Sequence, residues 1–221
     1  NLPLRLFALA HRLVFRLPLA MAARRCAFFF SHQSPTPMDT SPFLDHYQTQ
    51  LTDQLLRLCT NAHALTGQLL STPDLAERWN DVADPYLADA VPEIAKYPHV
   101  ALGWMMYVGM GLAHLWDSEW ERIAAGTDLY ALLRDPRGFD CLDEEVREGI
   151  LGFERDGADY RECEAVVRAC AQCALDRIRR EQIEPQSPEA FHIYVRSLRA
   201  LYEVGIAVEL KRLGYKYEAI G

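Results

Sequence analysis

The chain has 221 residues, of which half are hydrophobic and 24% are charged, and its formal net charge is −8 at pH 7. This composition is that of an ordinary globular protein, which excludes disorder over the whole length. Residues 1–38 contain five arginines and no acid, so residues 39–221, with 18 basic and 31 acidic residues, carry about −13. Because so acidic a surface repels phosphate groups, we expect no nucleic-acid binding.

Residues 1–38 differ from everything that follows. Arg12 and Arg16 interrupt their apolar stretch, which argues against a secretory signal, whereas the lack of acids fits a targeting segment better. We interpret 1–38 as a non-core N-terminal extension that is either disordered or not part of the native protein, with Met38 as the natural start. The alternative is a targeting or membrane-surface segment. Residues 39–221 are expected to form one helical domain.

The first expected element is a helix that begins at Ser41 and Pro42. A serine side chain can accept a hydrogen bond from a free backbone N–H of the first helical turn. A proline in that turn loses nothing by having no N–H, because the first turn leaves that donor without a helical partner. Apolar residues then recur at steps of three, four and seven, which is the spacing of one helix face. These residues are Leu44, Leu51, Leu55, Leu58, Ala62, Leu65 and Leu69.

Thr72-Pro73 repeats the same start signal for a second helix. Farther along, Pro85 and Pro92 remove backbone donors and clash with the preceding turn. One long helix between Pro73 and Pro98 is therefore not expected. We predict two or three short helices there.

The segment from Pro98 to Ala125 is expected to form a central helix that stops at Gly126. Its seventeen residues Val100–Trp116 carry no formal charge, which falls short of the about 20 apolar residues that a membrane span needs. Amphipathic helices on both sides of this segment need an apolar partner, so we predict a buried helix and no membrane span. Its three glycines require either a close backbone or an open cavity.

The remainder of the chain is also expected to be helical. We predict a short helix over Thr127–Arg134, another from Asp140 to Phe153, and long helices over Ala158–Glu181 and from Ser187-Pro188 to the C-terminal tail. Strand signals are nearly absent. The predicted fold is all-α: a single bundle of about six to eight helices around the central apolar helix 98–125.

A pocket beside the central helix is one candidate site. Thioether and aromatic side chains adapt to irregular shapes, and glycines leave room beside them, which suits an apolar ligand. The candidate lining residues are Trp104, Tyr107, Met110, Gly111 and His114, with Met105 and Met106 beside them. The alternative is that this methionine and aromatic stripe is ordinary core.

His114, Asp117 and Glu121 form a second candidate site. Steps of three and four place them on one face of a helix, where an imidazole and two carboxylates would suit a divalent metal. One helix cannot complete such a site, so donors are needed from His63, Asp84, Asp89, Glu93, Glu203 or Glu209. The alternative is a solvated acidic turn, with His114 bonded to a backbone carbonyl. Apart from this divalent metal, no cofactor is predicted.

The six cysteines are interpreted as reduced thiols of a cytoplasmic protein, because a chain this long and apolar needs no disulfide framework. Cys170 and Cys173 have the spacing of a redox or zinc pair. However, they lie in the middle of a predicted helix among apolar neighbours, not at a helix N-terminus where the thiol pKa is lowered. We therefore expect buried small hydrophobes.

Three functions remain open, because the common nucleophile, nucleotide and zinc-protease motifs are missing from the sequence. The first is a non-catalytic interaction or scaffold domain that binds a protein partner or forms a homo-oligomer. The second is a binder of apolar small molecules, with its pocket beside helix 98–125. The third is a metal-dependent helical-bundle enzyme that uses His114, Asp117 and Glu121. The non-catalytic roles are favoured over the enzyme.

Overall fold

The computed structural model describes residues 41–216, which fold into eight α-helices with no strand. The all-α prediction is confirmed, whereas the predicted extension 1–38 lies outside the described residues. The helices are α2 (Ser41–Asn61), α3 (Pro73–Ala76), α4 (Asn80–Lys96), α5 (Pro98–Ser118), α6 (Trp120–Ala125), α7 (Leu142–Glu144), α8 (Ala158–Arg180) and α9 (Pro188–Arg212). Short 3-10 turns, η1 (Tyr130–Leu132) and η2 (Phe139–Cys141), and a π-helical turn, η3 (Glu145–Ile150), complete them.

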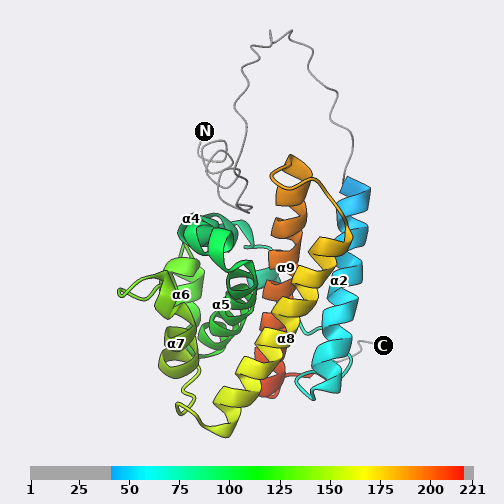
Figure 1. Ribbon diagram of the computed structural model, residues 1–221. Helices are drawn as coiled ribbons and strands as arrows, with labels where there is room; N and C mark the ends of the chain where they lie inside the picture. The colour runs from blue at the N-terminus through cyan, green and yellow to red at the C-terminus, as the bar shows by residue number, and fades with distance from the viewer. Residues whose placement is uncertain (1–40, 217–221) are drawn as a thin grey trace.

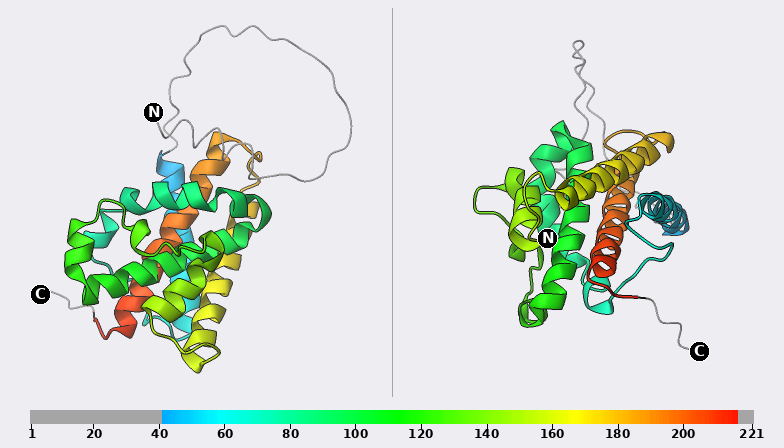
Figure 2. Two further views of the ribbon diagram at one scale, coloured as in Figure 1. Left: turned by 90° about the vertical axis from the view of Figure 1, so that its left-hand side faces the viewer. Right: turned by 90° about the horizontal axis from the view of Figure 1, so that it is seen from below.

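The helices are arranged in layers around α5 and α9. Helix α2 lies on the outside of the α8–α9 pair, α5 packs against the other side of α9, and α4, α6 and α7 cover α5 (Figure 1; Figure 2). Thirteen residues of α5 are buried, as the uncharged segment predicted, and thirteen residues of α9 are buried with them. The centre of the bundle is therefore a pair of helices.

None of the helices between residues 41 and 216 has both the length and the apolarity to cross a membrane. The uncharged segment 100–116 is instead covered by amphipathic helices of the same chain. The apolar faces of these helices need a buried partner, which this segment supplies.

Glycines set the crossing of the central pair. A Cβ atom on Gly109 would lie 2.2 Å from the carbonyl oxygen of Tyr202, and one on Gly205 would lie 2.2 Å from the carbonyl oxygen of Met106. Since no side chain fits at these two points, the backbones of α5 and α9 touch directly. The close-backbone explanation is therefore right for Gly109, while Gly103 and Gly111 face side chains of α8 and of the η1–η3 region.

The predicted helix 98–125 is wrong at its C-terminal end, because α5 ends at Ser118 and α6 begins at Trp120. Glu119 leaves the helical conformation, with φ −138° and ψ 49°. The Ser118 hydroxyl donates a hydrogen bond to the carbonyl of His114 at 2.8 Å, and such a bond competes with continued helix. Acidic side chains at this helix end also face the negative pole of the helix dipole.

The prolines of α4 do not break it, contrary to prediction: Asn80–Lys96 is one helix with Pro85 and Pro92 inside. The carbonyl of Asp81, which the residue at position 85 would normally bond, accepts the backbone N–H of Leu129 at 3.1 Å. Tertiary structure thus replaces the donor that Pro85 lacks. Four buried residues on one face give the helix its packing, namely Val82, Tyr86, Ala90 and Ile94.

Other helix boundaries were predicted with mixed success. Ser187 caps α9 as predicted, accepting the backbone N–H of Ala190 at 3.1 Å, and α8 follows its predicted range closely. Helix α2 ends at Asn61, before the last of the apolar repeat, because His63 adopts a positive φ of 60°. The two short helices predicted between 127 and 153 are mostly 3-10 and π turns.

Candidate functional site

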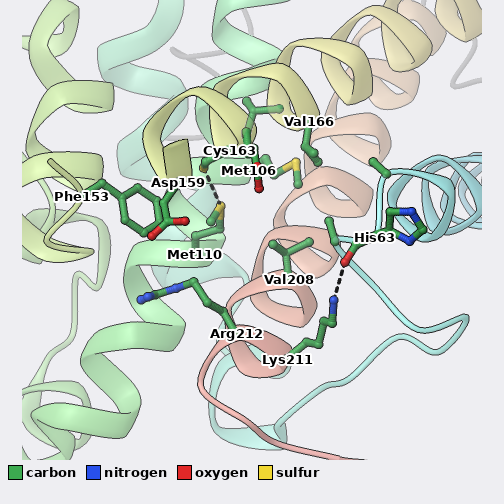
Figure 3. A pocket seen from close by; sticks show the side chains of 14 residues that line it. His63, Met106, Met110, Phe153, Asp159, Cys163, Val166, Val208, Lys211 and Arg212 are labelled. Carbon is green, nitrogen blue, oxygen red and sulfur yellow. Dashed lines mark hydrogen bonds between the residues drawn. The ribbon is translucent and has the colours of Figure 1, made fainter. Parts of the chain in front are cut away.

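A pocket of about 260 Å³ lies between α5, α8 and α9, beside the segment that follows α2 (Figure 3). Met106 and Met110, one turn apart on α5, form its floor, and Figure 3 shows Cys163 of α8 directed at Met110. The lining consists of Ala62, His63, Ala64, Met106, Met110, Phe153, Asp159, Glu162, Cys163, Val166, Val167, Val208, Lys211 and Arg212. We call this the α5–α8–α9 pocket.

The cysteine in the pocket lining is a weak nucleophile. The Cys163 thiol donates to the Met110 sulfur at 3.8 Å, and burial raises the pKa of Cys163 to about 12. A thiol with so high a pKa is protonated at neutral pH, and the thiol is a much weaker nucleophile than the thiolate. The arrangement therefore suits binding by contact, without covalent chemistry at Cys163.

Charged groups stand at the rim. Lys211 donates to the backbone carbonyl of His63, which ties α9 to the segment after α2 (Figure 3). Asp159 and Glu162, both exposed, bring negative charge from the first turns of α8. The rim thus carries both signs around an apolar floor.

Arg212 joins the rim to a buried carboxylate. Its guanidinium donates to both oxygens of Glu209, at 2.7 and 2.6 Å, and lies 5.1 Å from the centre of the Phe153 ring. Glu209 is fully buried, and its Oε1 is also 2.9 Å from Nδ1 of His114. A buried carboxylate is tolerated only when it is paired, and here an arginine and an imidazole share it.

The metal candidates are not brought together. His114 pairs with Glu209, Asp117 accepts a hydrogen bond from the Tyr215 hydroxyl at 2.6 Å, and Glu121 is exposed on α6, beyond the helix break. Between residues 41 and 216, no group of three or more histidine, cysteine, aspartate or glutamate side chains is placed to hold a metal ion. The alternative for His114 is also corrected, since its partner is a carboxylate instead of a backbone carbonyl.

Of the five residues predicted to line a pocket, Met110 lines this one. The Trp104 ring packs against Phe139 at a tilt of 54°, with ring centres 4.7 Å apart, and the centre of the Tyr107 ring lies 5.3 Å from the Arg147 guanidinium. Gly111 packs against Leu133 and Val146. His114 reaches the pocket only indirectly, through the Glu209 and Arg212 pair.

Sequence reasoning missed most of the lining. Cys163, Val166 and Val208 stand in the apolar stripes of α8 and α9, but a stripe does not show which of its members faces a neighbour and which faces open space. In the sequence, Lys211 and Arg212 are basic residues in the last turn of a predicted helix, and that pattern does not indicate a pocket. No family model matches this chain, and the searches of curated proteins and solved structures returned no match either.

Proposed function

We propose that the protein binds a small apolar molecule in the α5–α8–α9 pocket. The observation that supports this most is an open pocket of about 260 Å³ whose floor is two methionines that do not fill it. Methionine side chains reshape around ligands at little cost, because they have three rotatable bonds and a polarisable sulfur.

The volume of the pocket limits the size of the ligand. A cavity of about 150 Å³ can hold benzene, so this pocket has room for about ten non-hydrogen atoms. This volume lies just below the range of about 300–1,000 Å³ that is usual for ligand pockets. At about 0.5 kcal/mol per atom, such a ligand would bind with a Kd of roughly 0.2 mM. The ligand class is therefore a short alkyl or monocyclic compound.

An interaction or scaffold role has weaker support. The large apolar side chains that are most exposed among residues 41–216 stand on different elements: Phe43, Tyr97, Trp120 and Tyr215. An interaction surface normally gathers such side chains into one patch, and here Tyr215 has its ring 5.7 Å, centre to centre, from that of half-buried Trp116.

Binding is tested by saturation-transfer NMR with 1-octanol as the probe. We expect saturable transfer to the alkyl chain, and its loss in the Val208→Trp variant, where an indole occupies the pocket. Val195→Trp is the matched control, because Val195 is a half-buried valine of the same helix outside the lining. Equal transfer to both folded variants, or none to the unaltered protein, would exclude the pocket as the binding site.

A further inference from the structure

Two thiols from different helices meet in the core, outside the lining of the α5–α8–α9 pocket. Cys59 lies in the last turn of α2 and Cys170 in the middle of α8, and their sulfur atoms are 3.5 Å apart. Both residues are completely buried. The pair suggested by sequence spacing, Cys170 and Cys173, lies within a single helix, whereas the contact links residues 111 positions apart.

The distance is short enough for a bond to form with small movements. A disulfide has a sulfur–sulfur length of about 2.05 Å, so the two atoms need to approach by roughly 1.5 Å. Helix α2 lies on the outside of the α8–α9 pair and packs mainly against these two helices (Figure 2). A rotation of the two side chains, with a slight shift of the last turn of α2, can supply that approach.

The environment makes the two sulfurs unequal. The hydrogen bond with Cys170 lowers the pKa of Cys59, while the same bond, together with burial, raises the pKa of Cys170. Cys59 is therefore the thiol that ionises first, and the thiolate is the nucleophile that attacks a peroxide. Because Cys59 is fully buried, an oxidant reaches its sulfur only when the end of α2, two residues farther along, opens locally.

We propose that Cys59 and Cys170 form an intramolecular disulfide when the protein is exposed to a peroxide. The Cys59 thiolate attacks one peroxide oxygen and becomes a sulfenic acid as the O–O bond breaks. The hydroxide that leaves takes up the proton released by the Cys59 thiol and becomes water. The Cys170 sulfur then attacks the Cys59 sulfur, and the hydroxyl group leaves as a second water. Both thiols are oxidised and one hydrogen peroxide is reduced to two waters, so no other reactant is needed.

The bond would join α2 to α8 and close a loop of about 110 residues. Cross-links that close long loops restrict the unfolded chain strongly, so the oxidised protein should unfold at a higher temperature. This inference concerns a thiol pair that the α5–α8–α9 pocket does not include, and it stands whether or not a ligand binds there.

The test uses the full chain treated with hydrogen peroxide, followed by alkylation of the remaining thiols and non-reducing peptide mass mapping. We expect a Cys59–Cys170 linked peptide that is two hydrogen atoms lighter than its parts, together with a rise in Tm of several degrees that dithiothreitol reverses. The Cys163→Ser variant is the matched control and should keep both effects, because the Cys163 sulfur contacts Met110 instead of a thiol.

Two results would overturn the proposal. One is recovery of Cys59 and Cys170 as alkylated thiols after peroxide treatment and unfolding, while half-buried Cys173 is oxidised. The other is a link from Cys59 to any cysteine other than Cys170. Because the mapping is done on the unaltered chain, neither result depends on a variant that has to fold.

Discussion

At the scale of single residues, the buried carboxylate of Glu209 depends on the side chains that pair with it. Its carboxylate is fully buried, and it is held by a bidentate arginine and an imidazole. The charge of such a group is tolerable only while its partners stay in place, since an unpaired buried charge is costly. The pair Glu209–Arg212 also fixes the Arg212 guanidinium at the pocket rim beside Phe153.

We expect Glu209→Gln to lower the free energy of unfolding by about 2–3 kcal/mol, because Arg212 loses its counter-charge while remaining partly buried. Chemical denaturation measures the loss. Glu203→Gln is the matched control: it removes a partly exposed carboxylate of the same helix that pairs with Arg199 at 2.9 Å, and it should cost less than about 1 kcal/mol. Similar losses in both variants would contradict the special role of Glu209.

At the scale of elements, the crossing of α5 and α9 depends on two glycines that touch the facing backbone. Helix formation by itself disfavours glycine by about 1 kcal/mol relative to alanine, so these positions are understandable only from the neighbouring helix. Sequence reasoning reached the correct alternatives for α5, a close backbone or a cavity. Deciding between these two explanations requires the position of α9, whose Gly205 lies 96 positions beyond Gly109 in the sequence.

Gly109→Ala is expected to destabilise the protein by about 2 kcal/mol, because its methyl group would collide with backbone that cannot rotate away. Gly149→Ala serves as the control. Position 149 is exposed, and there the methyl group meets only the end of the Glu145 side chain. Thermal unfolding followed by circular dichroism should therefore show a fall in Tm for the first variant and little change for the second. An unchanged Tm for Gly109→Ala would mean that the helices do not touch there.

At the scale of the whole molecule, the core contains many tyrosines that burial keeps protonated. Burial raises the pKa of each of them, in the case of Tyr47 from 10.0 to about 12. The others are Tyr86, Tyr107, Tyr130, Tyr194 and Tyr202. Their hydroxyl groups ionise in the unfolded chain at a lower pH than in the native protein.

Stability should therefore be complete below pH 10 and should fall as the pH rises from 10 towards 12, where the unfolded chain loses protons that the native protein keeps. Each such tyrosine contributes a slope of up to about 1.4 kcal/mol per pH unit. Urea unfolding at pH 8, 9, 10 and 11 measures the decline, and Tyr47→Phe should make it shallower. A constant free energy of unfolding up to pH 11 would show that these hydroxyl groups reach water.

The sequence by itself determined the features that depend on local pattern. Three local signals were sufficient to predict an all-α bundle with a buried central segment. They are helical periodicity, the proline start signals at Thr72-Pro73 and Ser187-Pro188, and the uncharged segment at 100–116. These signals act within one or two helical turns, so no knowledge of distant residues was needed.

Only the tertiary structure decided the pocket, the Glu209–His114 pair and the contact of Cys59 with Cys170. Each of these joins side chains from different helices, and the geometry that joins them is set by how α2, α5, α8 and α9 pack against one another. A helical stripe shows that a residue faces inward, but whether it meets a backbone, a charge, a second thiol or open space depends on the facing helix.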